Sequence, residues 1–337
     1  MKIVILDGYT TNPGELDWSA LKDLGEVRIY DRTAKNEILK RAEGATALLT
    51  NKTTLDRETL LHLSSVKYIG VLESGYNVVD VDTASERGIV VTNVPGYSTA
   101  SVAQHVFALI AALTNHAEQL SGDVHKGRWG KSKDFCFWDD TLLELDGKTF
   151  GILGLGAIGS RVATIARAFG MRVIAWNRTP KKINGIEFTG QDEVFRQSHI
   201  VSLHLPLVPE TACIVNQARV SVMRHNAIII NTSRGGLIDE PALAAALNEK
   251  QIYGAGIDVL TEEPPREGSP LIGARNCIIT PHVGWASYEA RKRLIEQAAK
   301  NLKGYITGNP VNIVKRSDSL TCGKRYCGIF SCREILE

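Results

Sequence analysis

Three polar residues that could do chemistry each follow an apolar segment in the second half of the chain. Arg234 comes after "AIIINTS", Glu263 after "GIDVLTE" and His282 after "CIITP". If these segments are parallel strands, their carboxyl ends meet at one edge of a sheet, and the three side chains lie close together. Taken singly, each has a structural alternative: Arg234 could pair with a surface acid, Glu263 could cap a loop, and His282 could be a hydrogen-bonded turn residue.

Together these residue types suit the reduction of a carbonyl group by hydride and proton transfer. A histidine ionises near neutral pH and can give a proton to the carbonyl oxygen. A carboxylate on its other ring nitrogen fixes the tautomer and favours the imidazolium. A guanidinium offers a planar pair of donors to a carboxylate and stabilises charge on the reacting oxygen. The set therefore predicts a 2-oxo acid site in which Arg234 holds the anion.

A glycine-rich turn earlier in the chain predicts a dinucleotide site. Gly154, Gly156 and Gly159 form a GxGxxG pattern between the apolar "KTFGIL" and the helical "RVATIARAFG". In a strand–turn–helix unit this pattern presents backbone N–H groups to a pyrophosphate. The next strand, "RVIAW", is followed by Asn177 and Arg178, with no carboxylate to repel a 2′-phosphate. We therefore expect NAD(P), with NADP(H) or dual use favoured unless Arg178 is only a solvated loop cation.

The remaining sequence alternates strands with helices, which predicts an α/β protein built on parallel sheets. Over the first hundred residues "KIVILD", "ATALLTN", "VKYIGVL" and "GIVVTNV" alternate with helical segments, and a second alternating series starts at the glycine turn. Long helices are expected in "SVAQHVFALIAALTNHAEQL" and "SYEARKRLIEQAAKNLKGYITG". From Lys315 on the pattern stops, so the tail 315–337 is expected to be disordered.

Composition excludes several classes of protein. The 337 residues are 44% hydrophobic and 23% charged with a net charge of +2, and no basic run suggests nucleic acid or a membrane surface as a partner. The start, "MKIVILDGYT", is interpreted as a strand rather than a signal peptide, so a cytoplasmic location is expected. Cys322, Cys327 and Cys332 in the tail form no CxxC pair, and no metal is expected there.

The chain resembles the D-isomer-specific 2-hydroxyacid dehydrogenase family over about residues 1–314. The resemblance is carried by "ESGYNVVDVDTASERGIVVTNVPGYST", "GLGAIG", "NTSRGGLIDE", "GAGIDVLTEEPP" and "TPHVGWAS". Within the family the chain is most similar to glycerate dehydrogenases (hydroxypyruvate reductases), notably in "VTNVPGYSTASVAQHVFAL", "FCFWD" and "HVGWAS".

This resemblance implies two doubly wound parallel-sheet domains. A Rossmann NAD(P)-binding domain, residues 100–287, would be inserted into a flavodoxin-like substrate-binding domain formed by residues 1–99 and 288–314. The resemblance also implies a homodimer formed through the coenzyme domain. The aromatic segment around Trp129, Phe135, Phe137 and Trp138 is compatible with such an interface.

The resemblance also assigns roles. Arg234 would bind the substrate, Glu263 would orient His282, and His282 would donate or accept the proton. The backbone amides of Ser74 and Gly75 would hold the substrate carboxylate. The expected cofactor-binding residues are Gly154, Gly156, Ala157, Ile158, Gly159, Asn177, Arg178, Leu205, Pro206, Thr232 and Asp258, with Asp258 reaching the nicotinamide carboxamide.

The expected activity is the interconversion of a small 2-oxo acid and its D-2-hydroxy acid, namely hydroxypyruvate or glyoxylate and D-glycerate or glycolate. Trp285 could narrow the pocket for such substrates or simply pack. Two alternatives stay open: another D-2-hydroxyacid such as lactate or a bulkier acid, and a dinucleotide-sensing corepressor similar to the C-terminal binding proteins. Glu73 stands where many relatives carry a small residue, so we expect it to face away from the anion loop or to pair with a cation.

Overall fold

The computed structural model describes residues 1–179 and 182–314, and the tail with its three cysteines lies outside this part of the chain. The chain divides into two compact units. Of the described residues, the first unit contains 1–98 and 285–314, and the second contains Thr99–Gly284. Among the described helices, none is long and apolar enough to cross a membrane.

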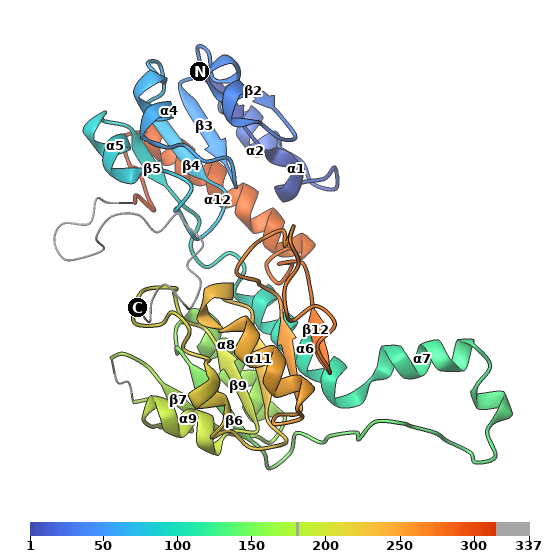
Figure 1. The fold of residues 1–337 in the computed structure, drawn as a ribbon. Helices are drawn as coiled ribbons and strands as arrows, with labels where there is room; N and C mark the ends of the chain where they lie inside the picture. Colours follow the sequence, from blue (N-terminus) through green and yellow to red (C-terminus); the bar gives the residue numbers. More distant parts are fainter. Residues whose placement is uncertain (180–181, 315–337) are drawn as a thin grey trace. The chain divides into compact units, whose positions relative to one another are not determined.

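The first unit is a five-stranded parallel sheet in the order β2-β1-β3-β4-β5 (Figure 1). Its strands are β1 Lys2–Ile5, β2 Glu26–Ile29, β3 Ala47–Thr50, β4 Tyr68–Val71 and β5 Val90–Thr92. Its helices are α1 Gly8–Thr11, α2 Ser19–Lys22, α3 Ile38–Arg41, α4 Arg57–His62, α5 Val81–Glu86 and α12 Tyr288–Ile306.

Helices cover both faces of this sheet because successive strand residues point to opposite sides. Ile3 and Ile5 pack with α2 and α12 in one core, whereas Val4 and Leu6 pack with α3, α4 and α5 in the other. The sheet is therefore buried on both faces, as the continuous apolar segments predicted.

The second unit is a seven-stranded parallel sheet in the order β12-β11-β10-β9-β6-β7-β8. Its strands are β6 Thr149–Leu153, β7 Arg172–Trp176, β8 Glu187–Phe188, β9 Ile200–Leu203, β10 Ile228–Asn231, β11 Gly254–Ile257 and β12 Cys277–Ile279. Its helices are α6 Thr99–Asn115, α7 Ala117–His125, α8 Ala157–Ala168, α9 Gln191–Gln197, α10 Gln217–Val220 and α11 Glu240–Asn248. The prediction of two doubly wound α/β domains is confirmed.

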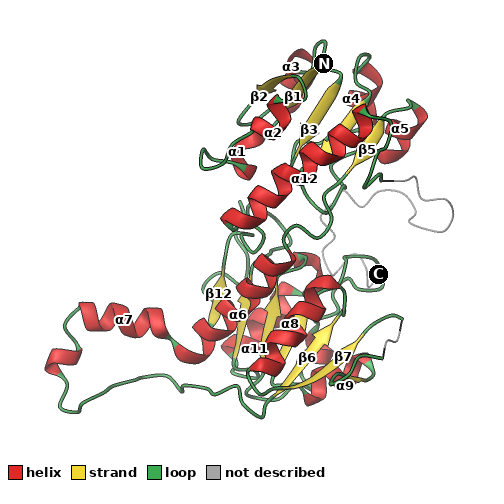
Figure 2. Cartoon of the chain, turned by 180° about the vertical axis from the view of Figure 1, so that it is seen from behind, coloured by secondary structure: helices red, strands yellow, loops and turns green. Residues whose placement is uncertain are grey.

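Two helical layers enclose this second sheet as well (Figure 2). The helices α6 and α8 pack on one face, and α9, α10 and α11 pack on the other. The strand order reverses between β6 and β9, because β6 lies between β9 and β7. In such sheets ligands bind beyond the carboxyl ends of the strands at the point of reversal.

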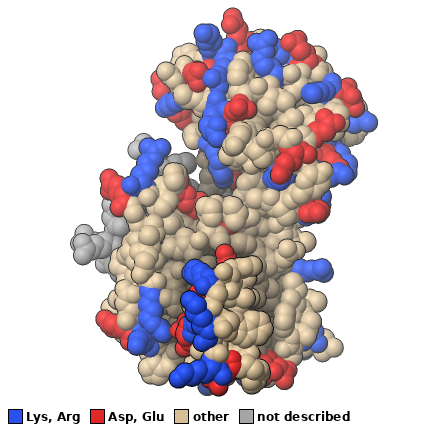
Figure 3. Space-filling model, turned by 90° about the vertical axis from the view of Figure 1, so that its right-hand side faces the viewer, with Lys and Arg blue, Asp and Glu red and all other residues tan. Residues whose placement is uncertain are grey.

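An arm, residues 117–142, projects from the side of the second unit (Figures 1 and 2). It contains α7, in which no residue is buried, and an extended return segment. At its base the Leu143 amide donates to the Thr114 carbonyl at 3.0 Å, and the Tyr253 hydroxyl donates to the Thr141 carbonyl at 3.0 Å. On the face drawn in Figure 3, basic and acidic side chains are interspersed.

Candidate active site

The glycine turn joins β6 to α8, and two of its three glycines, Gly154 and Gly159, have a steric reason. Gly154 has a left-handed φ of 98°, and a Cβ there would lie 2.3 Å from the His204 carbonyl oxygen. A Cβ on Gly159 would lie 2.2 Å from the Gly154 carbonyl oxygen. Gly156, the N-cap of α8, would carry its Cβ into open space. The first N–H groups of α8, on Ala157 and its neighbours, have no partner in their own helix and are open to an anion.

Two buried polar atoms beside this turn have no hydrogen-bond partner within residues 1–179 and 182–314. They are Nδ1 of His204 and Oγ1 of Thr232. The strand register makes them neighbours, because Leu203 of β9 pairs with Asn231 of β10. Burial lowers the pKa of His204 to about 4, so its ring is uncharged at neutral pH. Unpaired buried polar groups are costly unless a ligand or water completes them, and with the open space at Gly156 they fit a bound dinucleotide.

The end of β7 presents a cation rather than an acid. Asn177 is occupied by its own turn: its Oδ1 accepts from the Leu155 amide at 3.2 Å and its Nδ2 donates to the Thr179 carbonyl at 2.7 Å. Arg178 is exposed and forms no ion pair with the described part of the chain. The guanidinium therefore remains available to an incoming phosphate.

Glu263 and His282 form a close pair at the carboxyl ends of β11 and β12. The His282 Nδ1 and the Glu263 Oε2 are 2.6 Å apart, and the other carboxylate oxygen accepts from the Leu260 amide at 3.1 Å. A carboxylate accepts hydrogen bonds, so the proton on this ring edge belongs to Nδ1 and Nε2 is left for a reacting oxygen. Both side chains are about one-third exposed, at 32% and 36%, so substrate can reach them.

Arg234 follows β10 on the same sheet edge. The side chain is exposed, its Nη1 donates to the Ser233 carbonyl at 2.7 Å, and within the described residues it has no acidic partner. The alternative that Arg234 pairs with a surface acid is therefore wrong for this part of the chain. Gly235 behind it is required, because a Cβ there would lie 2.0 Å from the Leu260 carbonyl carbon.

Asp258 ends β11 next to the pair and is 2% exposed. Although burial raises the pKa of Asp258, hydrogen bonds from His105, Thr280, Gly284 and Val283 outweigh it and hold the pKa below its ordinary value. The carboxylate is therefore ionised in the fold. Its predicted contact with the nicotinamide carboxamide stays a prediction.

The predicted anion loop belongs to the first unit. The Ser74 side chain donates to the Val94 carbonyl at 3.0 Å, and Asn93 donates to the Ser74 carbonyl at 2.6 Å. The backbone amides of Ser74 and Gly75 donate no hydrogen bond to any described residue. Glu73 pairs with Lys52, whose Nζ lies 2.6 Å from Oε2. The expectation that Glu73 pairs with a cation agrees with this contact.

The remaining predicted residues are apolar. Leu205 is 9% exposed in the core of the second unit beside Gly154, and Pro206 is exposed after it. Trp285 packs in the core of the first unit, edge-to-face with Tyr97 at 6.4 Å between ring centroids. This contact agrees with the alternative that Trp285 simply packs, and a role of Trp285 in narrowing a substrate pocket stays a prediction.

Three polar residues of the site were not singled out from the sequence: His105 and Thr280 beside Asp258, and His204 beside the glycine turn. His105 lies on α6 between apolar residues of one face, three after Val102 and four before Leu109, and a polar residue within an apolar stripe was the available signal. His204 and Thr280 each come directly after a strand, as the predicted residues do. Within the described residues, no group of three or more His, Cys, Asp or Glu side chains could hold a metal ion.

Comparison with known proteins places this geometry in a family. The model of the D-isomer-specific 2-hydroxyacid dehydrogenase NAD-binding domain matches residues 107–284. The hydroxypyruvate reductase of Blautia hydrogenotrophica is 46% identical over 322 residues, covering 94% of this chain and 100% of that protein. The glycerate dehydrogenase of Methylorubrum extorquens is 38% identical over 293 residues, covering 86% and 92%.

A solved structure is also similar to this chain in fold and sequence. An acyclic imino acid reductase in complex with NADPH and D-Arg superposes with a TM-score of 0.82 at 32% identity, covering 94% of this chain and 100% of that one. The chain therefore belongs to the D-isomer-specific 2-hydroxyacid dehydrogenases, enzymes that interconvert 2-oxo acids and D-2-hydroxy acids with a nicotinamide cofactor.

Proposed function

We propose that this protein reduces hydroxypyruvate or glyoxylate to D-glycerate or glycolate, and catalyses the reverse oxidation, with NAD(P)(H). The observation that carries the proposal is the 2.6 Å contact between His282 and Glu263, in the unit that also carries the glycine turn. The hydroxypyruvate reductase and glycerate dehydrogenase relatives support this substrate class.

The roles of the side chains follow from their chemistry. When bound, the dinucleotide supplies the hydride that the carbonyl carbon accepts. His282, protonated and held through Nδ1 by Glu263, gives its Nε2 proton to the carbonyl oxygen, which becomes the hydroxyl of the product. Arg234 binds the substrate carboxylate and the reacting oxygen. That the amides of Ser74 and Gly75 bind a carboxylate stays a prediction. In the oxidation, neutral His282 takes the hydroxyl proton at Nε2.

Steady-state reduction of a panel of 2-oxo acids tests this function. Loss of nicotinamide absorbance should be fastest with hydroxypyruvate or glyoxylate and slower with pyruvate and branched 2-oxo acids. A higher kcat/KM for pyruvate or a bulkier acid would replace the proposed substrate. Absence of turnover with every acid would leave dinucleotide binding as the function.

The cofactor preference belongs to the same proposal. Arg178 is exposed, forms no ion pair with residues 1–179 or 182–314, and no carboxylate directly follows β7. We therefore expect NADPH to be used at least as well as NADH. Arg178→Ala should raise the KM for NADPH about 10-fold, the loss of one charge-assisted hydrogen bond, and leave the KM for NADH within twofold. Equal effects on both cofactors would make Arg178 a solvated loop residue.

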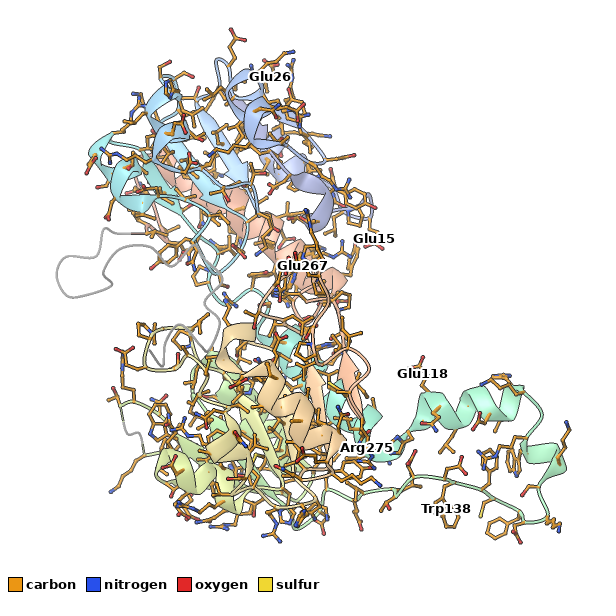
Figure 4. The ribbon with its side chains drawn as sticks, viewed as in Figure 1. Glu15, Glu26, Glu118, Trp138, Glu267 and Arg275 are labelled. Atoms are coloured by element: carbon orange, nitrogen blue, oxygen red, sulfur yellow. The ribbon has the colours of Figure 1, made fainter. Side chains whose placement is uncertain are left out.

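We also propose a cytoplasmic homodimer assembled through the arm. Large apolar side chains are exposed along it, Phe135 at 89%, Trp138 at 59% and Trp129 at 53%, more than a free surface usually shows together. Figure 4 shows Glu118 on α7 and Trp138 on the return segment, both away from the sheet. The Arg128 guanidinium stacks on the Phe137 ring at 4.3 Å, which stiffens the arm before any partner binds.

Sedimentation or light scattering checks this assembly. Phe135→Asp should weaken the dimer at least 10-fold because it places a charge in an apolar contact. Leu61→Asp, the same change at a residue of α4 that is 51% exposed, is the matched control and should leave the dimer intact. A wild-type monomer, or equal effects of both changes, would contradict the arm as the interface.

A further inference from the structure

Asp258 makes three hydrogen bonds to the loop that carries His282. The Asp258 backbone carbonyl accepts from the His282 amide at 2.8 Å, while its Oδ1 and Oδ2 accept from the Val283 and Gly284 amides at 2.9 Å each. His282 itself has a left-handed φ of 53°, a conformation that a histidine adopts only when its surroundings impose it. The three bonds to Asp258 fix that turn and thereby aim the imidazole at Glu263.

The Asp258 carboxylate is held in turn by Thr280 and His105. The Thr280 hydroxyl lies 2.6 Å from Asp258 Oδ1 and 2.9 Å from His105 Nε2. Its single proton must go to the carboxylate, which can only accept, so the hydroxyl oxygen accepts from Nε2–H of His105. His105 Nε2 also lies 3.3 Å from Asp258 Oδ1. The direction of these bonds therefore runs from His105 through Thr280 to Asp258.

Helix α6 contacts the same loop a second time. The Ser101 hydroxyl donates to the Gly284 carbonyl at 2.6 Å, one turn before His105 on the helix. A Cβ on Gly284 would lie 2.9 Å from Asp258 Oδ2 and 3.4 Å from His105 Cδ2, so the packing is too close for a larger residue. The first turns of α6 therefore contact this loop at Gly284 as well as through Thr280 and Asp258.

We propose that His105 and Thr280 are positioning residues for the reaction. Through Asp258 they hold the 282–284 loop in the conformation that keeps His282 on Glu263, a role that needs no contact of their own with substrate or cofactor. This inference rests on the proposed role of His282. The Asp258 carboxylate then serves to hold the loop, and both of its oxygens accept hydrogen bonds from the protein for that purpose.

Paired substitutions test this chain of hydrogen bonds from His105 through Thr280 to Asp258, here called the relay. Thr280→Val keeps the shape and removes the hydroxyl, and His105→Phe keeps a ring and removes the donor. Each should lower kcat about 10-fold while the KM for the 2-oxo acid and for the cofactor stay within twofold. The groups proposed to bind substrate and cofactor remain, and only the orientation of the His282 imidazole changes. Thr280→Ser and His105→Gln, which retain a hydroxyl and a donor nitrogen, should restore at least half of the wild-type kcat. Wild-type kcat in either disrupting variant, or no recovery in the conservative ones, would overturn the inference.

A double-mutant cycle separates positioning from simple loss of structure. If Thr280 acts through the His282–Glu263 contact, Thr280→Val should cost less than threefold in kcat once Glu263→Gln has already weakened that contact. Multiplicative effects would mean independent roles and would overturn the relay. His282→Asn in the same assay tests the proposed function separately. If that variant stays active, His282 is not the proton donor, and both the proposed function and the relay are contradicted. If His282→Asn is inactive while Thr280→Val is normal, only the relay fails.

Discussion

Replacing His282 should lower kcat by about 10²–10⁴, the range for losing a general acid–base, and change the KM of either substrate little. The reason lies in the contact geometry. Nδ1 is committed to Glu263 at 2.6 Å, which leaves Nε2 as the ring nitrogen available to a reacting oxygen. In the proposed mechanism, removal of the imidazole deletes the proton donor, while the groups proposed to bind the reactants, the Arg234 guanidinium and the glycine turn, stay in place.

The choice of replacement matters because the backbone at this position is unusual. His282 has a φ of 53°, so His282→Ala adds strain to the loss of the imidazole. His282→Asn removes the titrating group and tolerates a left-handed backbone, which makes it the cleaner variant. We expect both to fall within the same range in single-turnover and steady-state assays. If the asparagine variant kept near-full activity while the alanine variant did not, the proton would have to come from another group.

The sequence predicted the elements of this site because parallel strands leave their ends on one edge. Arg234, Glu263 and His282 were found as polar residues that follow apolar segments, and the sheet order of β10, β11 and β12 makes those segments neighbours. The sequence could not predict which atoms pair. The 2.6 Å contact depends on how the loop after Leu260 returns Glu263 to the end of β12, and no local propensity encodes that path.

The sequence pattern did not identify the hydrogen-bond or ion-pair partners of several polar residues. Asn177 stands where an adenine-ribose contact is expected, yet its amide closes its own turn onto Thr179. For Glu73 the charge argument left two outcomes, facing away from the anion loop or pairing with a cation, and only the folded loop identifies the cation as Lys52, 21 residues away in sequence. His105 lies on the apolar face of α6 and is 18% exposed, so its ring needs polar partners, which come from Thr280 and Asp258 on other elements.

Arg234→Ala should lower kcat/KM for the 2-oxo acid by about 10²–10⁴, through a higher KM and a lower kcat together. A guanidinium that makes two charge-assisted hydrogen bonds contributes about 3–6 kcal/mol, at about 1.5–3 kcal/mol each. The bond to the substrate carboxylate is present before and during the reaction and appears in KM, whereas the bond to the reacting oxygen strengthens as charge develops there and appears in kcat.

Arg234 is suited to this test because its side chain makes few contacts that could stabilise the fold. Within the described residues the exposed side chain makes a single hydrogen bond, to the carbonyl of its neighbour Ser233, so its removal should not change the melting temperature by more than a degree or two. Arg234→Lys keeps the charge but loses the planar fork, and should fall between the wild type and the alanine variant. Added guanidinium should restore part of the activity to Arg234→Ala and none to His282→Asn. Unchanged kinetics in Arg234→Ala would show that the anion is held by other groups, and then the exposed cation after β10 would be a surface residue.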